Sequence, residues 1–375
     1  MSTMLVGRYN RRRFLKRAAG LSISTAGVMV LAGCRATSPT PVVSRSAIET
    51  TRLRLVQTPS MCQAAQYVAE DLLREAGFTD LAYVKKPNPT AIGPALASGE
   101  ADINLHFAGP LLTQIAAGDP VVVLAGAHIG CFELFGSDRV QSIRDLKGRP
   151  VAVPALDSPP HVFLSTMLAQ VGLDPAADVR WETHPPPEAM QLLDEGRIDG
   201  YLGFPTDPQE LRARHIGHVV INSMIDRPWS EYFCCMVAAN REFVNLHPVA
   251  TRRALQAILS AVDLTTHDPE AAVRLLVDRG YTTQYDYTLD AVHAIHSLDW
   301  RDYDPEDTLR FYGLRLYEAG MVKQDPKQLI ARGADWQPFA DVKSELAPPP
   351  SASLAFCPLP VRPLAAAPPS QADRG

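Results

Sequence analysis

Cysteine and histidine are the residue types in this chain with the most reactive side chains, and their spacing limits the chemistry that is possible. The sequence contains six cysteines, of which only Cys234 and Cys235 are neighbours, and no two form a C-x-x-C motif. A redox motif or zinc knuckle therefore has no support, and no G-x-S-x-G, H-E-x-x-H or phosphate-loop motif is present. We expect no cofactor and no metal, and we interpret the cysteines mainly as buried apolar thiols.

The first 34 residues have the order of an export signal: a basic start, an apolar run over 18–31 and small residues before Cys34. Residues 11–16 (Arg-Arg-Arg-Phe-Leu-Lys) resemble a twin-arginine signal, although Asn10 stands where Ser or Thr is usual. Residues 31–34 (Leu-Ala-Gly-Cys) resemble a bacterial lipobox, whose cysteine is lipidated. A membrane-spanning anchor is the alternative, but it needs about 20 apolar residues. We expect residues 1–33 to be removed and the protein to be periplasmic, anchored to the cell membrane by lipid on Cys34.

Charge and composition limit the partners of the mature protein. Its net charge becomes −11 instead of −5, because six basic residues and no acidic ones precede Cys34. Such acidity is unsuited to a phosphate backbone, so no nucleic-acid partner is expected. About 340 mature residues suffice for two lobes. We expect residues 34–51 to form a flexible tether and the Pro- and Ala-rich residues 347–375 to form a disordered tail.

Strand-like runs alternate with helical patterns after residue 52, which predicts an α/β fold with mainly parallel strand pairing. Helices that start at a proline are expected over 248–266, 269–279, 305–318 and 326–332. Strands are expected over 53–57, 81–84, 103–107, 121–127, 150–153, 179–183, 200–204 and 219–222, with a further strand-like stretch over 229–238.

One pattern occurs twice in the chain. The pattern consists of a helix end, a glycine, two residues, an aspartate and a strand that ends in Phe. It occurs at Gly99 and Asp102, and again with identical spacing at Gly196 and Asp199. Glycine at a helix end supplies a left-handed turn, so the same supersecondary unit is predicted in both places. The repeat favours two similar α/β lobes that face one another, and chance similarity of short amphipathic units is the alternative.

Three segments carry a resemblance to a known family. Residues 229–243 (Trp-Ser-Glu-Tyr-Phe-Cys-Cys-Met-Val-Ala-Ala-Asn-Arg-Glu-Phe), with His-Pro-Val-Ala-Thr at 247–251, resemble solute-binding components of ABC importers of the NMT1/THI5-like group, beside the nitrate, sulfonate and taurine binding proteins. Residues 142–153 resemble the segment that opens the second lobe of these proteins, and residues 99–102 resemble their helix-to-strand corner. The resemblance covers roughly residues 53–346.

This resemblance implies a periplasmic binding protein fold of type II. Two α/β lobes are then joined by two crossing strands, with a ligand cleft between them. Residues 52–127 and 236–346 would form lobe one, and residues 128–235 would form lobe two. The resemblance further implies hinge closure around a small-molecule solute and delivery to an ABC permease in the inner membrane. We expect a monomer.

Loops at strand ends are the candidates for ligand contacts, because strand ends and helix N-termini point into such a cleft. Ser60 is either a helix N-cap or a ligand donor. Phe107 and Phe204 end the two repeated strands and either stack on a planar ligand or fill the core. His161 opens a helix and either meets the ligand or is a solvated loop histidine. The complete expected ligand-binding set is Ser60, Met61, His106, Phe107, His128, Ser158, His161, Phe204, Trp229 and Tyr232.

The type of solute is less constrained by the sequence. Lys and Arg are scarce in these loops, with Arg227 as the exception, and the aromatic cluster at Trp229 and Tyr232 suits a flat heterocycle, with simple hinge packing as the alternative. We therefore favour a pyrimidine-like solute, with sulfonate or nitrate next. Cys234-Cys235 also resembles the motif of fungal pyrimidine-synthesising enzymes, but that motif has more cysteines, so we expect a binding protein and no enzyme. An exported enzyme that uses cleft His and Cys, or a ligand-sensing subunit for a receptor, is the alternative.

Overall fold

The computed structural model describes residues 47–295 and 300–346. The predicted signal peptide, the lipidation site Cys34 and the predicted tail lie outside these residues, as does most of the predicted tether. None of the helices in the described part has the length and apolar character needed to cross a membrane. The strands are β1 (Arg52–Gln57), β2 (Asp80–Lys85), β3 (Ile103–Phe107), β4 (Val121–Ile129), β5 (Glu133–Gly136), β6 (Pro150–Val153), β7 (Arg180–Thr183), β8 (Gly200–Gly203), β9 (His218–Asn222) and β10 (Phe233–Asn240).

Helices flank these strands along the chain. They are α1 (Ala64–Val68), α2 (Glu70–Glu75), α3 (Ile92–Ala97), α4 (Ala108–Ala117), α5 (Pro159–Gln170), α6 (Pro186–Asp194), α7 (Asp207–Arg214), α8 (Arg241–Leu246), α9 (Pro248–His267), α10 (Pro269–Asp278), α11 (Tyr285–Ile295), α12 (Pro305–Glu318), α13 (Pro326–Gly333) and α14 (Gln337–Glu345).

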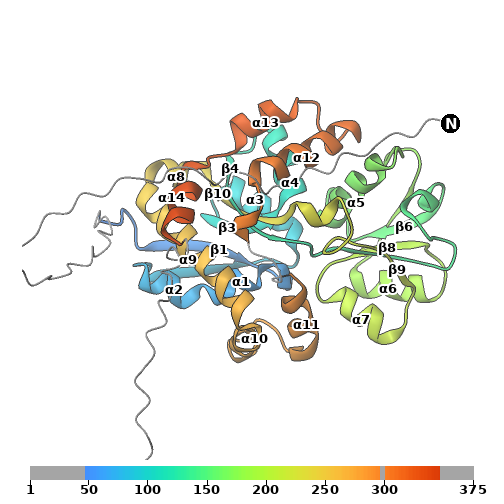
Figure 1. Ribbon diagram of the computed structural model, residues 1–375, viewed down its shortest axis with the longest axis horizontal. Coiled ribbons are helices and arrows are strands. Elements are labelled where there is room, and N and C mark those ends of the chain that lie inside the picture. The colour runs from blue at the N-terminus through green and yellow to red at the C-terminus, as the bar shows by residue number, and fades with distance from the viewer. Residues whose placement is uncertain (1–46, 296–299, 347–375) are drawn as a thin grey trace, which may run out of the picture. The chain divides into compact units, whose positions relative to one another are not determined.

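The strands form two α/β lobes (Figure 1). In lobe one, β1 pairs with β2 in parallel, and β10 lies between β3 and β4 in antiparallel pairing. In lobe two, the sheet has the order β7-β6-β8-β5-β9. The chain crosses between the lobes twice, from β4 to β5 and from β9 to β10. The residue limits of the lobes, at 127/128 and 235/236, stay a prediction.

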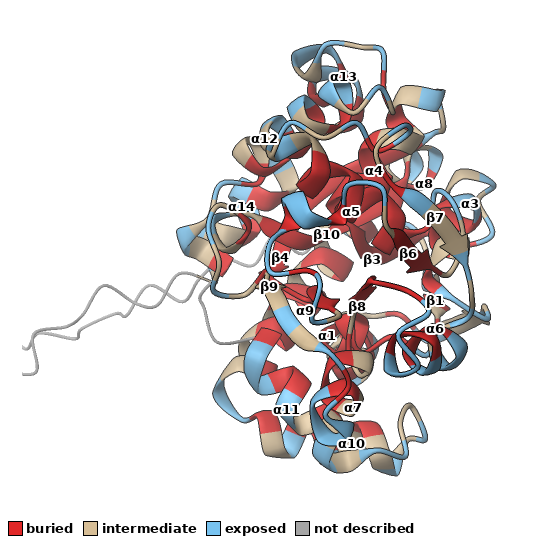
Figure 2. Ribbon diagram, turned by 90° about the vertical axis from the view of Figure 1, so that its right-hand side faces the viewer, coloured by how far each residue is buried: buried red, intermediate tan, exposed pale blue. Residues whose placement is uncertain are grey.

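The core of lobe one lies around β3, β4 and β10, which are buried along their whole length and appear red in Figure 2. Such strands consist of near-continuous apolar runs because both of their faces are covered. Helix α12 packs against both α4 and α5, and α5 belongs to lobe two. The two lobes therefore share a packed boundary on this side.

Local signals explain why the C-terminal helices start where they do. Asp268, Asp304 and Asp325 each accept hydrogen bonds from backbone N–H groups in the first turn of α10, α12 and α13, and a proline follows each of them. A capping carboxylate satisfies N–H groups that have no intrahelical partner, and proline at the first position loses nothing by lacking one. The predicted helices at 248–266, 269–279, 305–318 and 326–332 are confirmed to within one residue at each end.

Two aspects of the strand prediction differ from the structure. Strand β5 was not predicted, although β6, which has the same length, was. The expectation of mainly parallel pairing is wrong: β1–β2, β6–β7 and β6–β8 are parallel, but both neighbours of β10 and both neighbours of β5 are antiparallel. The two strands that follow the crossings each enter a sheet antiparallel to its neighbours, and the alternation of strands and helices contains no information on this direction.

The repeated pattern forms the same local structure in both lobes. Gly99 and Gly196 have φ angles of +71° and +68°, so both end their helices with a left-handed turn. Asp102 and Asp199 then donate their backbone N–H groups to the neighbouring strand, to the carbonyl oxygens of Arg54 and Pro150, at 2.8 Å each. The pattern therefore marks the same helix-to-strand corner twice.

Candidate functional site

A cavity of about 530 Å³ lies at the carboxyl ends of β1, β2, β6, β7 and β8, and residues of both lobes line it. This is the position at which open α/β sheets bind ligands, and the volume is in the range of small-molecule sites. The lining residues are Pro59, Pro87, Asn88, Pro89, Thr90, Pro154, Ser158, Pro159, Pro160, Pro185, Pro186, Phe204, Pro205, Thr206, Asp207 and Gln284.

Proline dominates the cavity wall, with nine of these residues. It also occupies the helix starts that face the cavity: α5 begins with Pro159 and Pro160, and α6 begins with Pro186. Proline has no N–H group, so these helix N-termini lack donors that usually bind anions there.

Asp207 is the ionisable residue among the described residues that line the cavity, and no Lys or Arg is among them. Burial raises the pKa of Asp207 to about 6. The hydrogen bond from the Tyr201 hydroxyl, which lies 2.6 Å from Oδ2, acts in the opposite direction and lowers this pKa. The carboxyl group therefore changes its charge within the pH range of a cell envelope. An anionic solute would meet a negative charge here above pH 6 and would find no side-chain cation among these residues.

Phe204 presents an aromatic surface to the cavity and is supported from behind by other rings. Its ring centroid lies 6.2 Å from that of Phe107 and 6.1 Å from that of Phe132, both at edge-to-face angles. Phe132 in turn stacks on Phe163 at 4.5 Å. Because Phe107 and Phe132 are buried and Phe204 is only partly so, Phe204 is the ring of this group that is placed to contact a solute.

Side chains join the lobes on both sides of the cavity. Thr206 of lobe two donates to Oε1 of Gln284 in lobe one at 3.0 Å. Arg212 on α7 pairs with Glu133 of its own lobe at 2.5 Å and with Asp290 on α11 at 3.1 Å. On the other side, Arg315 on α12 hydrogen-bonds Gln170 on α5. The lobes are thus in contact around the cavity.

Among the residues predicted to bind ligand, Ser158 and Phe204 line the cavity. The hydroxyl of Ser158 donates to the Ala155 carbonyl oxygen at 2.6 Å, so its oxygen has lone pairs left to accept a hydrogen bond. Ser60 and Met61 follow the lining residue Pro59 in the chain, and both are buried. Ser60 accepts a hydrogen bond from the Cys62 N–H at 3.4 Å, which is the capping role.

The predicted histidines are held in three different environments. His106 is buried, both ring nitrogens lack a hydrogen-bond partner, and burial lowers its pKa to about 4. His128 is buried beside cysteines at the first crossing. His161 packs against Trp181 with the ring centroids 4.7 Å apart and accepts the Asp157 N–H at 3.0 Å, and burial lowers its pKa.

Trp229 and Tyr232 lie in an aromatic cluster at the second crossing and are absent from the cavity lining. Trp229 is buried between Phe163 and Phe311, with ring centroids at 5.7 and 5.5 Å. Tyr232 stacks on Phe311 at 4.0 Å. Their ring contacts are those expected for hinge packing, the alternative that the sequence left open, and a role in ligand binding stays a prediction.

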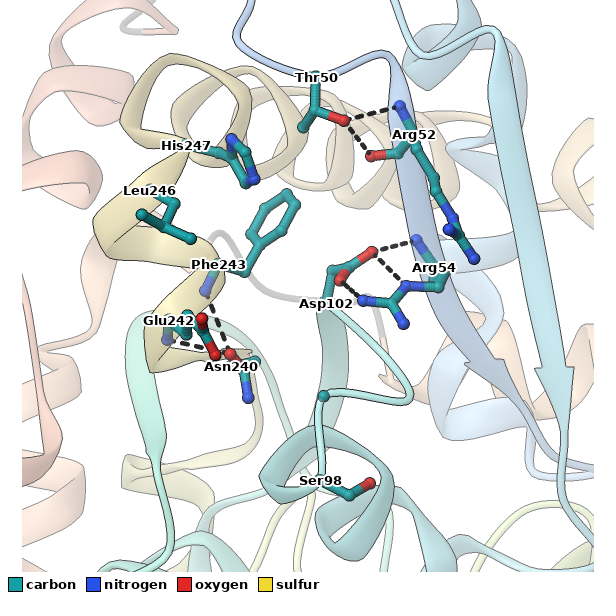
Figure 3. Close-up of a pocket in the computed structure, with 11 residues that line it drawn as sticks. Thr50, Arg52, Arg54, Ser98, Asp102, Asn240, Glu242, Phe243, Leu246 and His247 are labelled. Atoms are coloured by element: carbon teal, nitrogen blue, oxygen red, sulfur yellow. Dashed lines mark hydrogen bonds and ion pairs between the residues drawn. The ribbon is translucent and has the colours of Figure 1, made fainter.

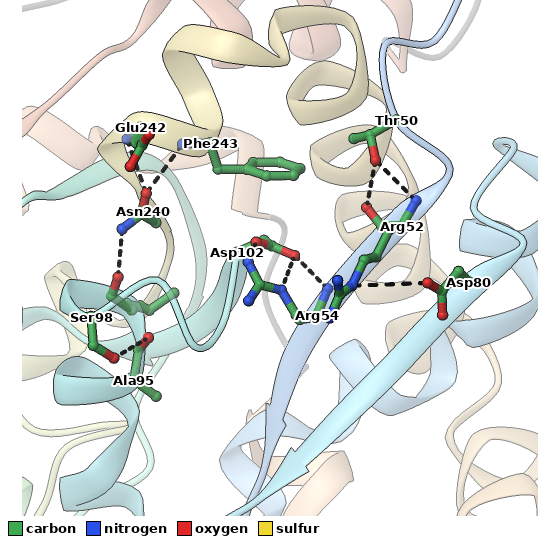
Figure 4. Close-up of polar contacts among 11 residues, drawn as sticks. Thr50, Arg52, Arg54, Asp80, Ala95, Ser98, Asp102, Asn240, Glu242 and Phe243 are labelled. Atoms are coloured by element: carbon green, nitrogen blue, oxygen red, sulfur yellow. Dashed lines mark hydrogen bonds and ion pairs between the residues drawn. The ribbon is translucent and has the colours of Figure 1, made fainter.

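A second cavity, of about 360 Å³, lies at the amino end of β1 and is drawn in Figure 3. Several of its polar side chains are engaged in structural contacts, whereas the buried Nδ1 of His247 has no hydrogen-bond partner among the described residues. Arg54 pairs with Asp102 at 2.5 Å, and the Asn240 amide accepts the Glu242 N–H and donates to the Leu96 carbonyl oxygen (Figure 4). Ligands bind at the carboxyl ends of strands in this type of sheet, so the cavity between the lobes is the better candidate.

Sequence reasoning did not identify five polar residues of the cavity. Asn88 and Thr90 follow β2, Thr206 and Asp207 follow β8, and Gln284 precedes α11. The first four lie just after strand ends, as Phe204 does, so the same positional rule would have found them. Gln284 comes from a turn between two helices, and no pattern in the sequence connects it with strand ends.

Comparison with solved structures shows similarity over most of the chain. The periplasmic nitrate-binding protein NrtA from Synechocystis PCC 6803 has 14% sequence identity and a TM-score of 0.66, with 80% of this chain and 90% of that chain covered. The alkanesulfonate-binding protein SsuA from Xanthomonas axonopodis pv. citri, bound to MOPS, has 16% identity and a TM-score of 0.59, with coverages of 77% and 100%.

A Candida albicans protein that exhibits the generic periplasmic binding protein fold has 11% identity and a TM-score of 0.61, with coverages of 76% and 96%. These similarities show that the chain has the periplasmic binding protein fold. No curated protein sequence gives a significant match. The model of the NMT1-like family matches residues 46–276, which is more than half of the chain. The chain therefore belongs to the NMT1-like family.

Proposed function

We propose that this protein is the extracytoplasmic solute-binding component of an ABC importer and that its solute is planar, uncharged or basic, and pyrimidine-like. The observation that carries the proposal is the cavity wall of nine prolines and Phe204, in which Asp207 is the ionisable group among the described lining residues. Flat apolar walls with a few polar groups suit the faces and edges of a heterocycle.

The absence of Lys and Arg from the described lining residues argues against nitrate or sulfonate as the preferred solute. Backbone N–H groups can bind an anion without side-chain cations, but Pro159 and Pro160 remove two of them from the start of α5. Asp207 instead offers a carboxyl group that accepts hydrogen bonds from ring N–H or amino groups. Asn88, Thr90 and Gln284 supply further polar contacts on the side of lobe one.

In this proposal, closure of the lobes captures the solute, and the closed form is recognised by a permease in the inner membrane. The contacts of Thr206 with Gln284 and of Arg212 with Asp290 stabilise the closed arrangement. The protein is exported through a twin-arginine signal. In its mature form it is a monomer, held in the periplasm by lipid on Cys34.

The test is native mass spectrometry of the protein as purified, followed by thermal-shift measurements with pyrimidines, nitrate, sulfonates and aromatic carboxylates. A solute that binds only the native state must raise the melting temperature. A co-purified heterocycle, or a shift confined to the pyrimidines, supports the proposal. A shift confined to nitrate or sulfonates overturns the solute class. A compound that returns chemically changed replaces the binding role with an enzymatic one.

A further inference from the structure

Four cysteines and one histidine from three separate segments meet in a buried region of the protein. Cys62 follows β1, His128 and Cys131 lie at the end of β4, and Cys234 and Cys235 lie at the start of β10. All four cysteines are free and buried. Their thiol groups interact with one another, with Cys131 and Cys235 in contact with each other and with both of the remaining thiols.

The distances in this group fit metal coordination. One ring nitrogen of His128 and the sulfur atoms of Cys131 and Cys235 all lie within 4.8 Å of one another. His128 Nδ1 lies 3.7 Å from Cys131 Sγ. In a tetrahedral site with metal–sulfur bonds of about 2.3 Å and metal–nitrogen bonds of about 2.0 Å, the donor atoms are about 3.5–3.8 Å apart. Because all three atoms lie within 4.8 Å of one another, coordination needs a contraction of at most about 1 Å at any pair.

The surroundings of His128 also favour a bound metal ion. Nε2 lies 2.9 Å from the Cys62 carbonyl oxygen, and Nδ1 lies 3.1 Å from the Ile129 carbonyl oxygen. A neutral imidazole has one N–H group, so one of its nitrogens would direct a lone pair towards an oxygen. Metal-binding histidines commonly donate the second ring N–H to a backbone carbonyl, and the Cys62 carbonyl oxygen near Nε2 is placed to accept such a bond, while Nδ1 lies on the side of Cys131.

The backbone is also unusual at one of these residues. Cys131 has a φ angle of +100°, in a region that residues with a side chain rarely adopt. Such conformations are strained and cluster at active sites and ligand-binding sites. Here the conformation directs the thiol of Cys131 towards His128 and the other cysteines.

We propose that His128, Cys131 and Cys235, with Cys62 or Cys234 as the fourth ligand, bind a thiophilic metal ion, Zn²⁺ or Cu⁺. A donor set of sulfur and imidazole nitrogen selects these soft ions over Mg²⁺ or Ca²⁺, which take oxygen ligands. The ligands join the end of β4 to the start of β10, the two segments at which the chain leaves and re-enters lobe one. Bound metal therefore restrains the hinge of the cleft.

Sequence spacing gave no sign of the complete site, because its three segments, at Cys62, at 128–131 and at 234–235, are 66 and 103 residues apart and only the fold brings them together. The proposal does not depend on the identity of the solute. It concerns a buried site, and none of its five residues is among the residues that line the cavity.

The test uses the full chain with Cys34→Ala, reduced and freed of metal under anaerobic conditions. Titration with Co²⁺ is expected to give one equivalent per chain, with the ligand-field bands of tetrahedral cobalt and thiolate-to-cobalt charge-transfer absorption. Zn²⁺ should displace the cobalt. Competition with a Cu⁺-specific chelator then shows which of the two ions binds more tightly.

Cys131→Ala and Cys235→Ala are expected to weaken binding by more than about 100-fold, since loss of an outer-shell partner alone costs 10–100-fold. Cys357→Ala, which removes a thiol outside the described residues, is the matched control and should bind like the parent. Circular dichroism shows whether each variant is folded, and His128→Asn serves as a third variant that keeps every thiol. Mass spectrometry of alkylated thiols, with and without Zn²⁺, needs no substitution and should show three cysteines that Zn²⁺ protects, two of which are Cys131 and Cys235.

The proposal is overturned if the reduced parent binds none of the three ions, or if Cys131→Ala and Cys235→Ala bind them like the parent. It is also overturned if Cys357→Ala loses binding to the same extent, or if the purified parent contains a disulfide among the four buried cysteines.

Discussion

Asp102 and Asp199 occupy equivalent positions in the two lobes, each three residues after a left-handed glycine and each bonded through its N–H group to the neighbouring strand at 2.8 Å. Both carboxylates also pair with arginine. Asp102 accepts from Arg54, and Asp199 accepts from Arg139 at 2.6 Å and from Arg149 at 3.3 Å. The helix-to-strand corner is therefore stabilised in the same way in both lobes, by an ion pair between a buried carboxylate and a partly exposed guanidinium group.

Asp102→Ala is expected to lower the free energy of unfolding by about 3 kcal/mol, because Arg54 loses its partner at a partly buried site. The matched control is Asp80→Ala, which breaks the exposed pair with Arg52 at 3.9 Å (Figure 4) and should cost less than about 1 kcal/mol. Urea unfolding of both variants measures the difference. Equal losses would show that the corner depends on its backbone hydrogen bonds alone.

Asp207 should make the protein less stable as the pH rises. Its pKa is raised to about 6 in the folded state from 3.8, so the folded protein holds a proton that the unfolded chain releases. The stability from this group is full below pH 3.8 and is lost as the pH rises through 6, by about 2–3 kcal/mol. Urea unfolding between pH 4 and pH 8 should show this fall in the parent. Asp207→Asn, which can still accept the Tyr201 hydrogen bond, should remove it, and an unchanged slope would exclude Asp207 as its source.

Phe204 and Trp229 should respond to truncation in opposite ways. Phe204→Ala removes a ring from the cavity wall and should weaken the binding of a planar solute by about 1–3 kcal/mol. Trp229→Ala removes a buried ring between Phe163 and Phe311 and should lower stability by about 3–5 kcal/mol, with little effect on the affinity of the folded molecules. Calorimetric titration and thermal unfolding of both variants separate the two roles. A large affinity loss in Trp229→Ala alone would show that the Trp229 ring contacts the solute.

Asp290→Ala should shift the lobes towards an open arrangement. The substitution removes the contact of α11 with Arg212 but leaves the pair of Arg212 with Glu133 within lobe two. Because the pair is partly exposed, solute affinity should fall only about 2–5-fold. Small-angle X-ray scattering of the solute-free protein should show a larger radius of gyration. Asp307→Ala, which breaks a pair with Arg310 inside α12, should change neither quantity.

Cys34→Ala should release the protein from the membrane, because lipidation of this cysteine is the proposed anchor. Fractionation of cells and detection of the protein in the soluble and membrane fractions measure the effect. Cys357→Ala should stay in the membrane fraction. If Cys34→Ala stays there as well, residues 31–34 are not a lipobox.

The sequence predicts the fold well where the signals are local. The starts of α10, α12 and α13 follow from an aspartate cap and a proline, which need no tertiary contact to be recognised. The direction in which β10 enters between β3 and β4 depends on the path of the chain through the second crossing. No residue type within β10 specifies that direction, so the pairing could not be predicted.

For the candidate site, position in the chain was a better guide than residue type. Ser158 and Phe204 were found because they follow strands whose carboxyl ends meet at the cavity. Trp229 was predicted from its aromatic character, but whether a ring faces a cavity or the core depends on neighbours such as Phe311 that lie far away in sequence. The grouping of Cys62 with Cys131 and Cys235 has the same origin in tertiary structure.

The nine prolines of the cavity wall have a consequence for how the protein discriminates between solutes. A proline ring has no rotamers to freeze and a backbone already fixed in φ, so this wall loses almost no conformational entropy when a solute is enclosed. The same rigidity prevents it from reshaping around a bulkier molecule. The protein should therefore select solutes by size. A slightly larger analogue is rejected by steric collision, and a smaller one is held loosely.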